Sequence, residues 1–103
     1  MRRLNFIVFI WYAAAKAAVN TMTFGLAQEV AQKGIRVNCV APGFTETEIH
    51  AASGMPDRLN DYIPTVPMRR PAQPEEIAEA ILWFLSDAAS YVTGEVLRVA
   101  GGR

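Results

Sequence analysis

The chain of 103 residues is long enough for one small domain with a hydrophobic core, and for no more than one. Ten basic and ten acidic residues give a formal charge of zero and are spread along the sequence, which argues against a nucleic-acid-binding surface or an acidic tail. The single cysteine, Cys39, excludes an internal disulfide, and with one histidine, His50, the sequence has no set of zinc ligands. These features favour a small-molecule or protein partner and a reducing compartment.

The amino-terminal segment admits two interpretations. Met1-Arg2-Arg3 is followed by residues 4–12, which are apolar except for Asn5, and by Ala13-Ala14-Ala15, which is the order of features in a secretory signal. The run is too short to span a bilayer, which takes about 20 apolar residues. The alternative is that an internal helix begins at Tyr12, and the sequence downstream has to decide between the two.

Residues 12–41 predict a helix followed directly by a strand. Residues 12–32 are rich in strong helix formers, Gly34 is a typical residue to end the helix, and the larger apolar side chains recur every three or four positions, at Val19, Met22, Leu26 and Val30. Residues 35–41 are rich in β-branched side chains and are closed by Pro42-Gly43, which predicts a strand leading into a loop. A helix and a strand with so short a connection indicate an α/β protein.

The second half of the chain predicts a long loop, a helix and a final strand. Residues 44–71 contain Gly54 and four prolines and leave room only for a short helix at 57–63, so they are expected to form a functional loop. A helix is predicted to begin at Pro74 and to end before Ser86, with its apolar residues at helical spacing and Trp83 and Phe84 in the core. Residues 95–99 predict a short strand.

Tyr12 and Lys16 form the first candidate for chemistry. Residues four apart lie on one face of a helix, so the phenol and the ammonium are expected to meet. An ammonium about 4 Å from a phenolate, at an effective dielectric constant near 20, stabilises it by roughly 4 kcal/mol, which would let the tyrosine exchange protons with a substrate near neutral pH. Alone, the pair is a weak motif, because Tyr12 is equally well explained as a helix-start residue and Lys16 as a solvated one.

Four separated motifs strengthen this candidate. They are Tyr12-Ala-Ala-Ala-Lys16-Ala-Ala-Val, Gly34-Ile-Arg-Val-Asn38, Pro42-Gly-Phe-Thr-Glu-Thr47, and Ser86-Asp-Ala-Ala-Ser-Tyr-Val-Thr-Gly94 with Gly101-Gly102. In this order and spacing they resemble the short-chain dehydrogenase/reductase family over residues 12–103. The resemblance treats residues 12–18 as part of an internal helix and displaces the secretory interpretation. It implies an α/β fold, namely the C-terminal portion of a Rossmann-like, doubly wound parallel sheet.

The resemblance implies roles for particular residues. Tyr12 matches the general acid that protonates a carbonyl oxygen during hydride transfer, and Lys16 matches the residue that activates it. The cofactor would be NAD or NADP, and the substrate an alcohol or carbonyl compound. The implied cofactor-binding residues are Lys16, Pro42, Gly43, Thr45 and Thr47. An ordinary turn and ordinary loop hydrogen bonds are the alternatives for the last four.

The family also implies features outside the catalytic pair. Asn38 matches a structural position that ties strand to loop, and the residues around Tyr62 correspond to a variable lid over the substrate. The expected protein is a cytoplasmic homo-oligomer that binds neither nucleic acid nor membrane and holds no metal. Arg69 and Arg70 are expected to be solvated.

The sequence departs from the family pattern in three respects. Residues 1–11 do not resemble the family and contain no serine, whereas the family's catalytic serine precedes the tyrosine by about a dozen residues. The asparagine of the preceding helix and the glycine-rich phosphate turn, G-x-G-x-x-G, are also missing. We therefore expect a truncated oxidoreductase, with residues 1–11 unmatched and residues 12–103 corresponding to the C-terminal half of the domain, that is inactive and marginally stable by itself. The alternative is a non-enzymatic remnant that assembles with a full-length relative.

Overall fold

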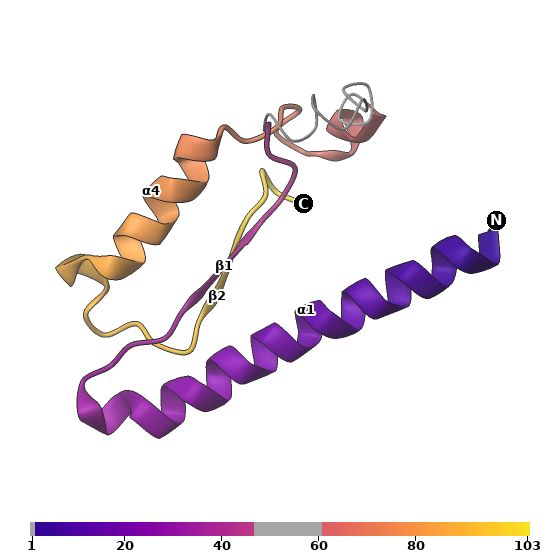
Figure 1. The fold of residues 1–103 in the computed structure, drawn as a ribbon. Coiled ribbons are helices and arrows are strands. Elements are labelled where there is room, and N and C mark those ends of the chain that lie inside the picture. The colour runs from indigo at the N-terminus through magenta and orange to yellow at the C-terminus, as the bar shows by residue number, and fades with distance from the viewer. Residues whose placement is uncertain (1, 47–60) are drawn as a thin grey trace. The chain divides into compact units, whose positions relative to one another are not determined.

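The computed structural model describes residues 2–46 and 61–103, with side chains described from Ile10 onward. These residues belong to two compact units. The first unit consists of Met1–Cys39 and Val92–Val96, and the second of Val40–Tyr91 and Leu97–Arg103. The element labels used below are those of Figure 1.

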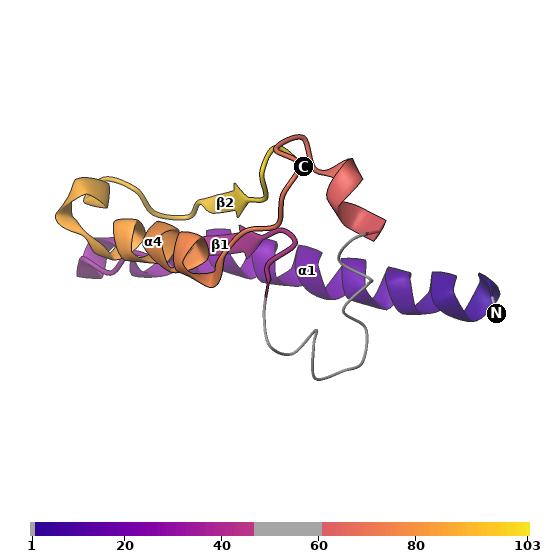
Figure 2. The same ribbon diagram turned by 90° about the horizontal axis from the view of Figure 1, so that it is seen from above.

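Helix α1 spans Arg2–Val30 and is drawn as one uninterrupted helix in Figure 1 and Figure 2. It therefore begins ten residues before the predicted start at Tyr12. No proline or glycine precedes Gly25, so a helix nucleated in the alanine-rich segment can extend through the apolar residues before it. The helix ends as predicted, in a 3₁₀ turn at Ala31–Lys33 and at Gly34, whose φ of 74° is the left-handed conformation that glycine adopts easily.

The side of α1 that packs within the first unit is formed by small residues. Thr23 and Ala27 are buried, and the Thr23 hydroxyl donates a hydrogen bond to the Val19 carbonyl at 2.8 Å. Gly94 lies so close that a Cβ there would be 3.4 Å from the Ala27 Cβ. Larger apolar side chains, Val19 and Met22 among them, remain exposed. Hydrophobic periodicity thus identified the helix but not the side that is covered.

Strands β1 (Cys39–Pro42) and β2 (Val96–Val99) form a two-stranded sheet (Figure 1). The Cys39 amide donates to the Glu95 carbonyl at 2.8 Å and the Gly43 amide to the Val99 carbonyl at 2.9 Å, so the register advances in the same direction on both strands and the pair is parallel. The final strand was predicted correctly. The strand predicted at residues 35–41 is shorter, because part of its ladder is replaced by a side chain: the Val37 amide donates to the Thr93 hydroxyl at 3.0 Å.

Asn38 supplies a second side-chain link in the same region of the first unit. Its amide nitrogen donates to the Val92 carbonyl at 3.0 Å, and its amide oxygen accepts from the Glu95 backbone N–H at 3.1 Å. One side chain thereby satisfies two backbone groups on the segment that leads into β2. The structural role expected for Asn38 is confirmed, with the segment before β2 as its partner.

Helix α4 spans Pro74–Leu85, as predicted from its sequence signals. Pro74 occupies its first turn, and the Glu76 carboxylate accepts from the Gln73 backbone N–H at 3.0 Å, half of a capping box. Within the second unit Phe84 is buried, as predicted, but Trp83 is 45% exposed, so the prediction that both are core residues is wrong for Trp83. Neighbouring helix positions point about 100° apart, and in α4 the buried direction is that of Phe84.

The remaining helical elements of the second unit are short. A 3₁₀ helix at Ile63–Thr65 falls at the end of the helix predicted for residues 57–63, most of which lies outside the described residues. Another 3₁₀ helix, Asp87–Ala89, follows α4 and buries Ala89. None of the helices in the described part of the chain has the length and apolar character that a membrane span requires.

Candidate functional site

The two predicted catalytic residues meet on α1. The Lys16 Nζ lies 5.5 Å from the centroid of the Tyr12 ring, and 60% of Tyr12 is exposed. The ammonium therefore lies over the face of the ring, a cation–π arrangement that one helical turn makes possible. The proximity expected from the Tyr-x-x-x-Lys spacing is confirmed, and the phenol is open to solvent. The catalytic roles stay predictions.

The predicted cofactor loop begins where β1 ends. Pro42 closes the strand, and Gly43 donates its amide to the Val99 carbonyl across the sheet. A Cβ at Gly43 would lie 2.7 Å from the Ala100 Cβ and 2.8 Å from the Ala100 Cα. Ordinary carbon–carbon contacts are about 3.5 Å or longer, so the end of β1 meets the residue after β2 too closely for any side chain. Packing against Ala100 thus requires glycine at position 43. The family resemblance implies a second reason, namely that the backbone there comes close to the cofactor.

Thr45 continues the same loop, and Thr47 lies outside the described residues. The Thr45 hydroxyl donates to the Gly43 carbonyl at 3.1 Å, a local hydrogen bond of the kind that shapes a tight turn. Thr45 also pairs with Ala72 in an isolated parallel bridge. Thr45 therefore makes an ordinary loop hydrogen bond, which was the alternative to a role in cofactor binding. That role stays a prediction.

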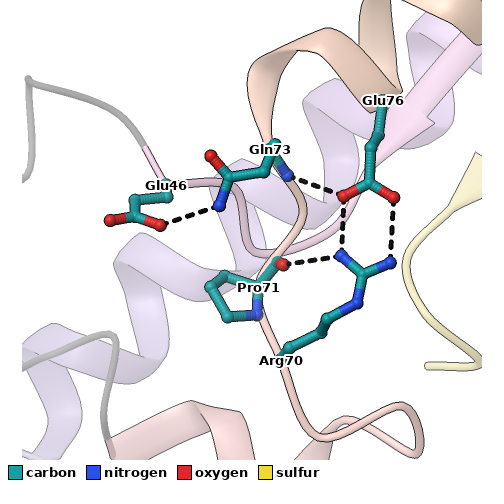
Figure 3. A network of polar contacts seen from close by, with 5 residues as sticks. All are labelled: Glu46, Arg70, Pro71, Gln73 and Glu76. Atoms are coloured by element: carbon teal, nitrogen blue, oxygen red, sulfur yellow. Dashed lines mark hydrogen bonds and ion pairs between the residues drawn. The ribbon is translucent and has the colours of Figure 1, made fainter.

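A polar network holds this loop to the start of α4 (Figure 3). The Gln73 side-chain amide donates to the Glu46 carboxylate at 2.9 Å, and Glu76 accepts from both terminal nitrogens of Arg70, at 2.6 and 2.9 Å. The same Arg70 guanidinium donates to the Pro71 carbonyl at 3.3 Å. The segment before α4 is thus linked to the loop after β1 through side chains as well as through the backbone.

The charges of the network reinforce each other. The hydrogen bonds from Arg70 and from the Gln73 backbone lower the pKa of the Glu76 carboxyl from 4.5 to about 2, and the same carboxylate raises the pKa of Arg70. The expectation that Arg70 is solvated is confirmed, since its side chain is 48% exposed, and the structure adds a partner, Glu76, that was not expected. Arg70 and Glu76 are six residues apart and not on one helix, so no helical spacing could have indicated the pair.

The described structure thus brings the candidate residues together in two sets. Tyr12 and Lys16 lie in the first unit, whereas Pro42, Gly43 and Thr45 are assigned to the second. In the first unit, the exposed Lys16 ammonium is a hydrogen-bond donor of the kind that the ribose of a nicotinamide cofactor requires. In residues 2–46 and 61–103, no group of three or more His, Cys, Asp or Glu side chains is placed to hold a metal ion.

An α/β protein with a Tyr-x-x-x-Lys helix, a parallel strand and a Pro-Gly loop has the architecture of a nicotinamide-dependent oxidoreductase. The chain belongs to the short-chain dehydrogenase/reductase family: the model of the family described as "Enoyl-(Acyl carrier protein) reductase" matches residues 5–103. This match begins inside the segment of residues 1–11 that the sequence analysis set apart, and the boundary after Trp11 stays a prediction.

Individual relatives agree with this assignment. The chain is 54% identical over 95 residues to the uncharacterized oxidoreductase YgfF of Escherichia coli (strain K12), covering 92% of this chain and 38% of the relative. It is 50% identical over 91 residues to a 3alpha-hydroxysteroid dehydrogenase of Mediterraneibacter gnavus, covering 87% and 36%. The crystal structure of a 3-oxoacyl-[acyl-carrier protein] reductase from Brucella melitensis superposes with a TM-score of 0.80 at 41% identity, covering 88% and 34%.

The comparisons confirm the fold class, since the solved neighbours are Rossmann-fold reductases of the same family. The chain spans between a third and two-fifths of the length of the relatives named above. The relatives carry names with different substrates, an acyl carrier protein thioester in one and a steroid in another. Relatives of one family thus carry names with different substrates.

Proposed function

We propose that this chain carries the acid–base pair and the nicotinamide-side loop of an NAD(P)-dependent oxidoreductase that interconverts an alcohol and a carbonyl group. The observation that carries the proposal is the Lys16 ammonium on the exposed Tyr12 ring, one turn apart on α1. A phenol beside an ammonium and open to solvent can reach a substrate oxygen. The family match over residues 5–103 supports this use of the pair.

In the proposed reaction Tyr12 donates its hydroxyl proton to the carbonyl oxygen of the substrate, or removes it in the reverse direction. Lys16 stabilises the resulting phenolate and donates a hydrogen bond to the ribose of the cofactor. A bound nicotinamide supplies or accepts the hydride. The Pro42-Gly43 turn and Thr45 shape the loop at the nicotinamide end, with Thr47 after them. The protein would act as a homo-oligomer in the cytoplasm.

The 103-residue chain taken alone is proposed to be inactive. It contains no serine before Tyr12 and no G-x-G-x-x-G turn to bind the pyrophosphate. Titration with NADPH and NADH, followed by fluorescence and combined with sizing chromatography, tests this directly. We expect no micromolar binding; tight binding by a folded species would refute the proposed inactivity.

The catalytic roles are tested in a chimera in which the part of this chain that aligns with the Brucella 3-oxoacyl-[acyl-carrier protein] reductase, 88% of its length, replaces the matching segment of that reductase. In this chimera Tyr12→Phe is expected to lower kcat by about 10²–10⁴, the usual range for loss of a general acid. Tyr91→Phe is the matched control, because Tyr91 is a fully exposed tyrosine on a turn. If the Tyr12→Phe and Tyr91→Phe chimeras turn over equally fast, Tyr12 is not the acid.

A second function, assembly with a full-length relative, is favoured by the exposed apolar side chains. Trp11 is 72% exposed and Leu85 73% exposed, so both side chains are open to contact with a second protein. In this proposal the chain would dock on a relative through such residues without catalysing a reaction. Co-purification of the tagged chain with a full-length relative, lost in Trp11→Ser or Leu85→Ser variants, would support it, and a monodisperse uncomplexed chain would exclude it.

A further inference from the structure

Three side chains of the second unit stack on one another. The rings of Phe44 and Tyr62 have centroids 4.8 Å apart and planes inclined by 13°, and the guanidinium carbon of Arg103 lies 4.6 Å from the Phe44 centroid. Both distances are within the range of favourable aromatic and cation–π contacts. The three residues come from the loop after β1, the helical turn before residues 63–65, and the last position of the sequence.

The backbone around Arg103 is held by a tightly packed glycine turn. The Met68 amide donates to the Gly101 carbonyl at 3.0 Å, and a Cβ at Gly101 would lie 2.9 Å from the Val66 Cγ1. A Cβ at Gly102 would likewise lie 3.0 Å from both the Cβ and the Cγ of Pro67. Both glycines have positive φ, 64° and 100°, which other residues adopt only with strain. The turn that presents Arg103 is therefore fixed against the segment of residues 66–68.

Phe44 is held from the other side by its backbone. The Ala72 amide donates to the Phe44 carbonyl at 2.8 Å, and the Glu46 amide donates to the Ala72 carbonyl at 2.9 Å. The ring thus projects from a loop that is anchored near α4, and its two side-chain neighbours come from segments distant in the sequence. Tyr62 lies directly before the single 3₁₀ turn formed by residues 63–65.

We infer that Arg103 is a positioning residue: its cation on Phe44, and the stacking of Phe44 on Tyr62, hold the segment that begins at Tyr62 beside the loop that follows β1. This inference rests on the proposed function, in which the loop after β1 lies at the nicotinamide end, and on the family resemblance, which implies that the residues around Tyr62 cover the substrate. Arg103 would then set the placement of the substrate cover without touching the reacting atoms.

Amide hydrogen exchange on the complete 103-residue chain tests the stack independently of catalysis. The reporter is the Val66 amide, which donates to the Ile63 carbonyl at 3.0 Å in a residue only 3% exposed. Arg103→Met, which removes the charge and keeps the chain length, is expected to speed this exchange about two- to fivefold, the effect of losing one exposed cation–π contact. Arg103→Lys should restore the slow rate, because it keeps the cation.

Two controls make the result specific to the stack. Arg98→Met removes the same charge from the exposed side of β2 and should leave the Val66 exchange rate unchanged. In a Phe44→Leu background Arg103→Met should have no further effect, because its partner is gone. Any one of three results would overturn the inference. The Val66 amide could exchange equally fast in Arg103→Met and Arg98→Met, the effect of Arg103→Met could persist in the Phe44→Leu background, or the Val66 amide could be unprotected in the unsubstituted chain.

The chimera with the Brucella reductase then separates this inference from the proposed function. There, Arg103→Met is expected to raise KM severalfold with little change in kcat, whereas Tyr12→Phe should lower kcat. If Arg103→Met speeds exchange of the Val66 amide but the chimera is inactive, the inference is supported and the proposed function is refuted. If the chimera is active and Arg103→Met does not change its KM, the inference is refuted but the proposed function is not.

Discussion

Replacement of Gly43 by alanine is the sharpest test of the packing at the end of the sheet. The new Cβ would be forced to within 2.7 Å of the Ala100 Cβ and 2.8 Å of the Ala100 Cα. Because the Cα belongs to the backbone, no rotamer change relieves the overlap, and the ends of β1 and β2 must separate. Separation also weakens the 2.9 Å hydrogen bond from the Gly43 amide to the Val99 carbonyl.

The expected cost follows from these two effects. Overpacking a close contact costs about 1–3 kcal/mol, and a lost backbone hydrogen bond about 0.5–1.5 kcal/mol. Alanine also lowers the conformational entropy of the unfolded chain, which offsets about 0.4–1 kcal/mol of the loss in stability. The net loss in local unfolding free energy should be about 0.5–4 kcal/mol, measured as faster hydrogen exchange in residues 97–103 together with a lower urea midpoint.

Gly25→Ala is the matched control. Gly25 lies inside α1, and a Cβ there would meet nothing within 4 Å. Alanine at such a helix position is expected to stabilise by about 0.5–1 kcal/mol, the opposite sign. If Gly43→Ala raised the urea midpoint as Gly25→Ala does, with unchanged exchange in residues 97–103, the close approach to Ala100 would be wrong.

Two further predictions concern polar contacts. The pKa of Glu76 is lowered on folding, from 4.5 to about 2, so the Arg70 pair contributes stability above pH 4.5 that is lost as the pH falls toward 2. Urea midpoints measured across this interval should fall more steeply for the unsubstituted chain than for Glu76→Gln, and parallel curves would contradict the pairing. Asn38→Ala should cost about 1–2 kcal/mol locally by removing its bonds to Val92 and Glu95. Asn38→Asp keeps the acceptor for the Glu95 amide, so exchange of that amide should quicken in Asn38→Ala and stay slow in Asn38→Asp; equal rates would exclude the side-chain bond.

Some features of this protein are determined by short stretches of sequence. Pro74 and Glu76 place the start of α4, and Gly34 places the end of the preceding helical segment, because the groups they satisfy lie within one helical turn. The meeting of Tyr12 and Lys16 follows equally from their spacing. The family was identifiable for the same reason, since its motifs combine local structure with chemistry.

Other features were decided only by tertiary structure. Strand β1 begins at Cys39 and not at Ile35 because the Thr93 side chain replaces a backbone partner, and Arg70 finds Glu76 only after the chain turns at Pro71. Three more features depend on segments that are far apart in the sequence. They are the burial of Phe84 in preference to Trp83, the need for glycine beside Ala100, and the contact of Arg103 with the Phe44 ring. A local pattern can specify a helix turn by turn, but it holds no information on which distant atoms will be within contact distance once the chain has folded.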